Sequence, residues 1–481
     1  MIELHDPSLL KNLCLINGEW VGADATSGIE VLNPATGECI AAVPALTAGQ
    51  VSDAVAAAEI AFRQWAAVTA HERSRLLRNW FDLLVANADD LASILTLEQG
   101  KPLREARSEI LYAASFIEWF SEEAKRIYGD TMSSPNGRQR IKVLKQPVGV
   151  TAAITPWNFP AAMITRKAAP ALAAGCTMIV RPSELTPLTA LALAELSIRA
   201  GIPAGVLQVV TGSSIEIGQV FTRDFRVRKL SFTGSTEVGS KLMAQCAANI
   251  QRVSLELGGN APFIVFDDAD IEAALDGAMI AKFRNAGQTC VCANRLYVQN
   301  GIYDTFVARF AEKVSALRVG PGNDPDTDIG PLVSPKAIAK VEEHISDALS
   351  KGATLVCGGE RKDGLFLTPA VLKDANCSMA FAQEETFGPL APIFRFETED
   401  EVIRAANATI YGLAAYFYTK DHARSIRVSE ALEYGMVGHN TAAISNEIAP
   451  FGGVKQSGQG REGSKYGIEE YLEMKYVCSS L

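Results

Sequence analysis

The chain has 481 residues, with 45 basic and 55 acidic side chains and a formal net charge of −10. Its 48% hydrophobic and 21% charged residues are typical of a soluble globular protein, and its length favours two or three domains. The acidic balance argues against nucleic acid or an anionic membrane as a partner, because both bind basic surfaces.

Targeting signals and cysteine content narrow the class further. No apolar stretch approaches the roughly 20 residues of a membrane-spanning helix, and residues 1–6 show no secretory signal. The nine cysteines are odd in number and scattered, which favours a reducing cytoplasm over a disulfide framework. Cys290 and Cys292 form the one close pair, but no second pair of ligands accompanies them. We therefore expect no metal site and interpret one of these thiols as reactive.

The predicted elements begin with a helix after Thr47, where Thr47 and Gln50 form a capping-box pattern. From about residue 150 the chain alternates between buried strands and helices. The expected strands lie at 150–154, 177–181, 206–210, 229–232, 262–266 and 295–299, and the helices between them begin at residues such as Pro160, Pro187 and Asp270. This alternation predicts an α/β fold with two doubly wound parallel sheets, joined near residues 256–259.

Two short runs fit neither sheet. Residues 140–148 and 471–478 alternate between polar and apolar side chains, as exposed strands do. An unpaired edge strand promotes aggregation, so we expect these strands to pair with one another or with another subunit. We therefore predict a homo-oligomer, either a dimer or a tetramer.

A glycine-rich turn at residues 232–239 leads from a strand into a helix. Backbone N–H groups at such a helix start form an anion site that suits a phosphate or pyrophosphate. The turn is not the usual dinucleotide motif. Residues 234–241 also miss the P-loop motif, because Ser240 precedes Lys241 where the motif has lysine before the hydroxyl residue, and this argues against a kinase. The alternative is a glycine turn that serves helix packing alone.

Three other turns hold candidate catalytic groups. Cys290 follows a glycine turn, and a thiol near a helix terminus has a lowered pKa; the alternative is a small buried residue. Glu256 lies between two leucines before a double glycine, which predicts a desolvated carboxyl with a raised pKa, suited to a general base. The alternative there is an ordinary turn between domains. Asn158 lies in a rigid turn between two prolines, where its amide is placed to donate to an oxyanion.

In their order and spacing, Asn158, Glu256 and Cys290 resemble the motifs of the aldehyde dehydrogenase superfamily. Residues 384–389 and 450–458 resemble its later signatures. The similarity extends from residue 17 to the C-terminal strand. Within the superfamily, the chain is most similar to the succinate-semialdehyde dehydrogenases, on the sequence strings 286–295 and 452–467.

The resemblance implies a mechanism. The Cys290 thiolate attacks the aldehyde carbon, while the Asn158 amide and the Cys290 backbone N–H hold the oxyanion. Hydride then passes to a nicotinamide and leaves a thioester, which water activated by Glu256 hydrolyses. It also implies a domain assignment: residues 1–134 and 149–256 bind NAD(P), residues 257–462 form the catalytic domain, and residues 135–148 and 463–481 form oligomerisation strands.

The family pattern also implies a cofactor site. Its expected residues are Trp157, Arg181, Ser183, Glu184, Gly234, Ser235, Leu257, Glu385 and Phe387. Glu184 accepts hydrogen bonds from free ribose hydroxyls and repels a 2′-phosphate, which favours NAD. Arg181 stands where the family usually has lysine and pairs readily with such a phosphate, so NADP stays open.

For the substrate, Arg166, Arg284 and Ser445 match the residues with which the succinate-semialdehyde family binds a distal carboxylate. Arginine suits a carboxylate because it donates two parallel hydrogen bonds; the alternative for each arginine is a surface salt bridge. On this basis, Arg166→Ala should raise KM for succinic semialdehyde far more than for an uncharged aldehyde.

Two expectations about the substrate pocket remain open. His439 replaces a small apolar residue expected near the substrate mouth, which leaves glutarate semialdehyde, another ω-carboxy aldehyde or a general aldehyde as alternatives. Cys292 is a possible redox partner of Cys290, and the alternative is a second small core residue.

Overall fold

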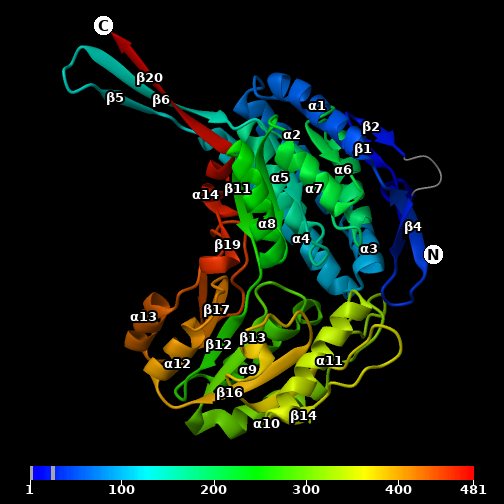
Figure 1. Cartoon of the computed structure of the whole chain (residues 1–481), viewed down its shortest axis with the longest axis vertical. Helices are drawn as coiled ribbons and strands as arrows, with labels where there is room; N and C mark the ends of the chain where they lie inside the picture. Colours follow the sequence, from blue (N-terminus) through cyan, green and yellow to red (C-terminus); the bar gives the residue numbers. More distant parts are fainter. Residues whose placement is uncertain (1–3, 23–27, 481) are drawn as a thin grey trace.

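The computed structural model describes residues 4–22 and 28–480, which form two α/β layers and a strand extension (Figure 1). The first sheet has eight strands in the order β19-β11-β10-β7-β8-β9-β1-β2. They are β1 (Cys14–Ile16), β2 (Glu19–Val21), β7 (Val150–Ile154), β8 (Thr177–Arg181), β9 (Leu207–Val209), β10 (Val227–Thr233), β11 (Arg252–Glu256) and β19 (Gly458–Gln459). The five central strands are parallel, while β19, β1 and β2 add antiparallel edges.

Helices cover both faces of this sheet, as a doubly wound fold requires. One face carries α1 (Ala48–Trp65), α7 (Ser214–Arg223) and α8 (Thr236–Cys246). The other carries α5 (Ala162–Ala174) and α6 (Pro187–Arg199), with an outer layer of α2 (Ala70–Ala86), α3 (Ala88–Gln99) and α4 (Leu103–Glu123). Successive residues of β7 show the alternation, since Ala152 packs in one core and Ala153 in the other.

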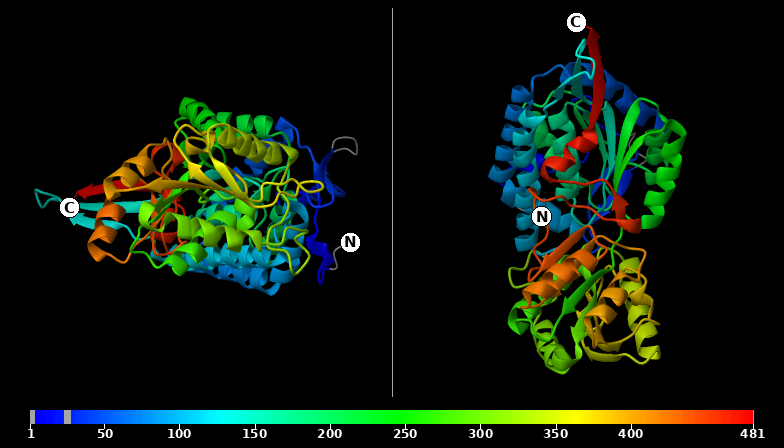
Figure 2. Two further views of the ribbon diagram at one scale, coloured as in Figure 1. Left: turned by 90° about the horizontal axis from the view of Figure 1, so that it is seen from below. Right: turned by 90° about the vertical axis from the view of Figure 1, so that its left-hand side faces the viewer.

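The second sheet has seven strands in the order β14-β15-β16-β13-β12-β17-β18, all parallel except β14. The right-hand view of Figure 2 shows this sheet and its helices below the first sheet. They are β12 (Ala261–Val265), β13 (Ala293–Gln299), β14 (Thr354–Cys357), β15 (Ala370–Ala375), β16 (Leu390–Phe396), β17 (Ala414–Tyr418) and β18 (Met436–His439). The helices around it are α9 (Ile271–Phe283), α10 (Tyr303–Ser315), α11 (Pro335–Ser350), α12 (Glu399–Asn407) and α13 (His422–Ala431).

The extension is a three-stranded sheet of β5 (Asp130–Ser133), β6 (Gln139–Pro147) and β20 (Leu472–Ser480). β20 pairs with β6 along its whole length, so the two expected exposed strands pair with one another. Figure 1 shows this sheet extending away from both layers, with the C terminus near its tip. A hairpin of β3 (Gly28–Leu32) and β4 (Cys39–Pro44) and the short helix α14 (Ser464–Gly467) complete the fold.

The fold class and several element bounds agree with the sequence prediction. The capping box of Thr47 and Gln50 is present at the start of α1, and β7 and β8 have the predicted bounds. Helix α5, however, begins at Ala162 rather than at Pro160. The bounds of two predicted segments also differ. β5 begins at Asp130, before the expected oligomerisation segment 135–148, and β19 joins the first sheet although 458–459 fall within the expected catalytic range 257–462.

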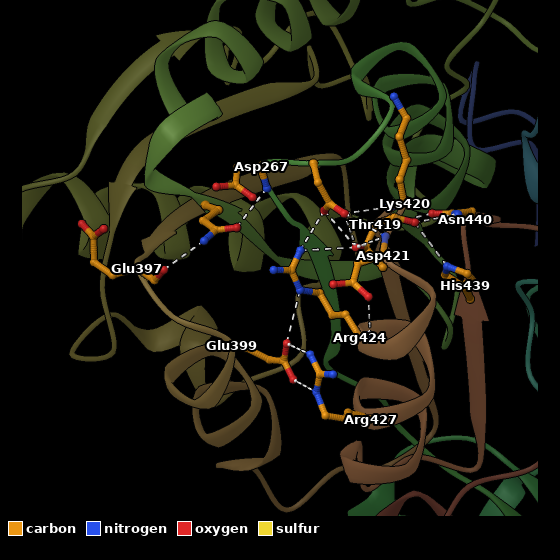
Figure 3. Close-up of polar contacts among 12 residues, drawn as sticks. Asp267, Glu397, Glu399, Thr419, Lys420, Asp421, Arg424, Arg427, His439 and Asn440 are labelled. Atoms are coloured by element: carbon orange, nitrogen blue, oxygen red, sulfur yellow. Dashed lines mark hydrogen bonds and ion pairs between the residues drawn. The ribbon is translucent and has the colours of Figure 1, made fainter.

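A polar network closes the carboxyl edge of the second sheet (Figure 3). Asp268, just after β12, accepts hydrogen bonds from Thr419 Oγ1 and Arg424 Nη1, both at 2.8 Å. Arg424 also contacts Glu399 at 3.2 Å and so ties α13 to α12. Cys290 precedes β13 and therefore lies at the opposite, amino edge of this sheet.

Candidate functional site

The site lies between the two sheets, where the carboxyl edge of the first meets the amino edge of the second. Three adjacent strands end at this edge. β7 ends at Ile154, shortly before Asn158, β10 ends just before Gly234, and β11 ends at Glu256 itself. The second sheet contributes Cys290 from the loop before β13. Ligands of open parallel sheets bind beyond the carboxyl ends of the strands, so the fold places the candidate groups where a ligand is expected.

Cys290 lines two cavities at once. The first has a volume of about 220 Å³, and its other lining residues are Pro156, Trp157, Asn158, Thr233, Gly234, Ser235, Leu257, Gly258, Glu385 and Phe387. The second holds about 20 Å³, and its other lining residues are Tyr112, Phe159, Met163, Arg166, Arg284, Thr289, Val291, Ser445 and Phe451. The thiol therefore faces an apolar, aromatic cavity on one side and a pocket with two arginines on the other.

The first cavity has walls suited to a flat ring. Trp157 and Phe387 meet edge to face with ring centroids 5.7 Å apart. Glu385 accepts a hydrogen bond from the Gly259 N–H at 3.0 Å, yet burial raises its pKa to about 8. At the far side, Ser235 caps the N-terminus of α8, so the backbone N–H groups of the first turn lie beside Gly234.

Asn158 is 3% exposed and lies between the two loops of the site. Its Nδ2 donates to the Gln288 carbonyl at 3.0 Å, while its Oδ1 has no hydrogen-bond partner among the described residues. One N–H of the Asn158 amide thus forms a hydrogen bond with the loop that leads to Cys290. The second N–H remains for a ligand in the first cavity.

Glu256 lies at the end of β11 with 3% of its surface exposed. Burial, followed by the charge of Glu462, raises its pKa well above the ordinary value, which confirms the direction expected from its apolar neighbours. Burial alone would also raise the pKa of Glu462, but Arg166 and Lys167 lower it. Two buried carboxyls therefore share two cations, and of the two it is Glu256 whose pKa is raised and Glu462 whose pKa is lowered.

The aldehyde dehydrogenase family profile matches residues 20–477 of this chain. The chain belongs to this family. The NADP(+)-dependent succinate-semialdehyde dehydrogenase of Escherichia coli K12 is 60% identical, and the alignment covers 100% of both proteins. The glutarate-semialdehyde dehydrogenase of Pseudomonas putida is also 60% identical, again over 100% of both. A crystal structure of an aldehyde dehydrogenase from Brucella melitensis biovar abortus 2308 is 66% identical, with a TM-score of 0.99 over 100% of this chain and 99% of that one.

The prediction of a lowered thiol pKa at Cys290 is wrong for this structure. Cys290 lies in a turn between the short helix Arg284–Gly287 and β13, and no α-helix begins there. Burial raises its pKa to about 12, against the opposing charge of Arg166. Desolvation outweighs one nearby cation, so the thiol is protonated at neutral pH.

Arg166 occupies a different setting from the one expected of a free carboxylate binder. It is 2% exposed, its Nε lies 2.7 Å from Glu462, and its guanidinium stacks 3.9 Å from the Phe451 ring. Its Nη2 still has no hydrogen-bond partner among the described residues. Arg166→Ala would therefore also leave Glu462 short of one cation, so the variant does not test carboxylate binding alone. Arg284 is exposed, stacks 4.9 Å from Phe159 and provides the cleaner test.

The candidate adenosine-end residues Arg181, Ser183 and Glu184 lie at the end of β8, next to β7, and line neither cavity. Arg181 Nη2 donates to Glu184 at 2.7 Å and to the Gly212 carbonyl at 3.1 Å. Burial would raise the pKa of Glu184, but Arg181 lowers it, so the carboxylate is ionised. Arg181 and Glu184 therefore form an ion pair rather than two independent charges.

The structure changes the expected place of His439, and it shows the surroundings of Cys292. His439 lies at the carboxyl edge of the second sheet, where it stacks on Phe417 and approaches the Thr419 carbonyl, so it does not lie at the substrate mouth (Figure 3). Cys292 is buried with its Sγ 3.1 Å from Lys282 Nζ, and all nine cysteines are free thiols.

Among residues 4–22 and 28–480, no group of His, Cys, Asp and Glu is arranged to hold a metal, and no helix is long and apolar enough to span a membrane.

Sequence reasoning missed the charged residues that surround the site from neighbouring helices and loops. Lys167 and Glu462 flank Glu256, and Lys101 and Glu109 contact the Asn158 turn. One signal was available for Lys167. It follows Arg166 in α5, where all thirteen residues are buried, and two adjacent cations in such a helix need buried partners.

Proposed function

We propose that this protein oxidises succinic semialdehyde to succinate with NAD(P)+ by covalent catalysis at Cys290. The position of Cys290 between the two cavities carries the proposal. A nucleophile between an aromatic cavity for a nicotinamide and a pocket with arginines suits an aldehyde that carries a distant carboxylate. The names of the relatives from Escherichia coli and Pseudomonas putida support a short semialdehyde substrate.

The residues fit a nicotinamide dinucleotide. Trp157 and Phe387 provide flat apolar walls, the Glu385 carboxyl faces the same cavity, and the start of α8 beside Gly234 suits a pyrophosphate. Ser235 and Leu257 complete the lining. When bound, the dinucleotide accepts the hydride that leaves the substrate carbon.

The chain's own groups then divide the remaining steps. The ionised carboxylate of Glu256, a neighbour of Cys290, takes the proton of the thiol and passes it to solvent, and the thiolate attacks the aldehyde carbon. The free N–H of the Asn158 amide, with the Cys290 backbone N–H, stabilises the oxyanion. Loss of hydride converts the thiohemiacetal into a thioester. Glu256 takes a proton from water, which attacks the thioester and releases succinate and the Cys290 thiol. The raised pKa of Glu256 brings its basicity closer to that required at neutral pH.

Initial rates with C4, C5 and uncharged aldehydes, each with NAD and NADP, test the proposal. We expect the highest kcat/KM for succinic semialdehyde. Higher kcat/KM for glutarate semialdehyde would favour the activity for which the Pseudomonas putida relative is named. Equal values for charged and uncharged aldehydes would instead indicate a general aldehyde dehydrogenase.

We expect Arg284→Met to raise KM for succinic semialdehyde roughly 10- to 100-fold and to leave KM for butanal nearly unchanged. Methionine keeps the apolar contact with Phe159 but removes the charge that pairs with the carboxylate. The assay is KM for each aldehyde. Arg318→Met removes an exposed arginine paired with Asp326 and serves as the control. Equal losses on both aldehydes would exclude Arg284 from carboxylate binding, leaving Arg166 and Ser445 to bind it.

For the cofactor, we propose that the Arg181–Glu184 pair sets the preference between NAD and NADP and that Glu184 favours NAD. Glu184→Gln should raise kcat/KM for NADP relative to NAD roughly tenfold, because the carboxylate no longer repels a 2′-phosphate or occupies Arg181. The ratio of the two kcat/KM values measures the effect, with the exposed Glu360→Gln as control. An unchanged ratio would show that other residues set the preference between NAD and NADP. The name of the Escherichia coli relative, which specifies NADP(+), argues for that result.

We also propose that the protein works as a cytoplasmic homo-oligomer, assembled through the extension of β5, β6 and β20. Apolar side chains on these strands are exposed in the single chain: Met132, Leu144, Met474 and Tyr476. Exposed apolar side chains gathered on one sheet mark a contact surface. Light scattering of the purified protein distinguishes a dimer, a tetramer and a monomer.

A further inference from the structure

The junction between α3 and α4 contains a buried cation that no catalytic step uses. Lys101 is 2% exposed, and its ammonium group contacts three partners. It donates to Glu109 at 2.6 Å and to the Asn158 carbonyl at 2.7 Å, and it lies 3.9 Å from the centroid of the Phe159 ring. All three contacts lie on or beside the turn that presents the Asn158 amide to the first cavity.

The partner carboxylate binds the other end of the same turn. Glu109 Oε1 accepts the Ala161 N–H at 3.0 Å, just before α5 begins. Its other oxygen accepts from Lys101. The ion pair therefore spans the turn from the Asn158 carbonyl to the start of α5 and fixes it against α4.

Helix α4 binds the second loop of the site as well. Glu105 accepts the Asn285 N–H at 2.8 Å, and Asn285 Nδ2 donates to the same Asn158 carbonyl at 3.0 Å. Asn285 and Ala286 have φ angles of 52° and 55°, a left-handed conformation that is unfavourable for non-glycine residues. The loop before Cys290 therefore holds its shape through contacts such as these.

The junction itself has little freedom to shift. Gly322 packs so closely that an added Cβ would lie 2.4 Å from the Lys101 carbonyl oxygen. At Gly100, whose φ is +93°, a Cβ would lie 2.7 Å from Pro331. Lys101 thus projects from backbone that is packed against the catalytic half of the chain.

A buried ion pair contributes little net stability, because desolvation offsets the attraction between its charges. Its main consequence here is geometric. We propose that Lys101, paired with Glu109, is a positioning residue that sets the Asn158 amide at the distance from Cys290 at which it stabilises the oxyanion. This inference rests on the oxyanion role of Asn158 in the proposed function.

The first test is Lys101→Met, which keeps the apolar stem and removes the charge. We expect kcat to fall about 10- to 100-fold with KM changed less than about threefold, since the oxyanion contact strengthens only in the transition state. The rate of Cys290 alkylation by iodoacetamide should stay within about twofold, because alkylation needs no oxyanion donor. A rise in KM with kcat unchanged would overturn the assignment.

A double-mutant cycle shows whether Lys101 acts through Asn158. If it does, adding Lys101→Met to Asn158→Ala lowers kcat by no more than about twofold beyond Asn158→Ala alone. Losses that multiply would overturn the proposal. If Asn158→Ala has no effect on kcat, the oxyanion role fails and the inference fails with it. An impaired Asn158→Ala with a fully active Lys101→Met overturns the inference alone.

Two more variants separate positioning from folding. Glu109→Gln keeps an acceptor for the Ala161 N–H but breaks the ion pair, and should lower kcat about 3- to 10-fold even if Lys101→Met does not fold. Ile110→Ala removes a fully buried, uncharged side chain of the same helix that lines neither cavity. It should lower the melting temperature and leave kcat within about twofold. An equal kcat loss in Ile110→Ala would assign the effect to general destabilisation.

Discussion

Cys290→Ser should abolish aldehyde oxidation, with kcat lowered on the order of 10⁴-fold or more. The serine hydroxyl fits the site but is a far weaker nucleophile than a thiolate, because its pKa lies far above that of a thiol. Steady-state rates with succinic semialdehyde measure the loss. Quenching of Trp157 fluorescence, on the wall of the first cavity, should show that the dinucleotide still binds.

Cys377→Ser is the matched control, because Cys377 is exposed and lines neither cavity. It should retain full activity. The pH dependence of alkylation gives an independent check on the nucleophile. Because burial raises the pKa of Cys290 to about 12, the alkylation rate without dinucleotide should rise about tenfold per pH unit from pH 7 to near pH 11. A plateau at neutral pH would mean that the thiol is already ionised.

Glu256→Gln should stop the reaction after one turnover. Glutamine has nearly the same shape as glutamate but cannot take a proton from water, so the thioester on Cys290 should accumulate. Rapid-mixing experiments should show a burst of about one reduced dinucleotide per site, followed by a steady rate about 10³-fold below wild type. Mass spectrometry of the quenched enzyme identifies the thioester. A normal steady rate would show that another group activates the water.

The pH profile tests the electrostatics of the same residue. Glu256 acts as a base only when ionised, and its pKa is raised by burial and by Glu462. Thioester hydrolysis should therefore increase with pH well above the ordinary glutamate range. Glu462→Gln removes a negative neighbour and leaves Arg166 and Lys167 free to favour the ionised form. The rising limb should shift to lower pH in that variant, and a shift to higher pH would contradict the arrangement described.

The sequence predicted the parts of the site that follow from local patterns. Asn158, Gly234 and Glu256 stand in glycine- or proline-rich turns next to apolar runs, and parallel strands bring their carboxyl ends to one edge. The partners of these groups could not be predicted in the same way. Glu462 reaches Lys167 from almost three hundred residues away, and burial of both depends on packing that no local pattern encodes.

The thiol pKa shows the same limit. A glycine turn before Cys290 gives no measure of how much water the folded site excludes, and that exclusion decides the direction of the shift. The role of Arg166 also depended on context. The residue lines the pocket beside Cys290, as the prediction requires, but its Nε already contacts a carboxylate of the chain, that of Glu462, which no local pattern indicates.

The return of the C-terminal segment to the first sheet has a consequence for biosynthesis. β19 pairs with β11 at Leu255 and Glu256, and Glu462 lies buried beside the same strand end. Ribosomes make the chain from its N terminus, and its domains begin to fold in that order. The surroundings of Glu256, the proposed general base, are thus assembled from two segments translated some two hundred residues apart. A nascent chain that already contains Cys290 therefore lacks the segment that encloses Glu256 until the C-terminal part has been made.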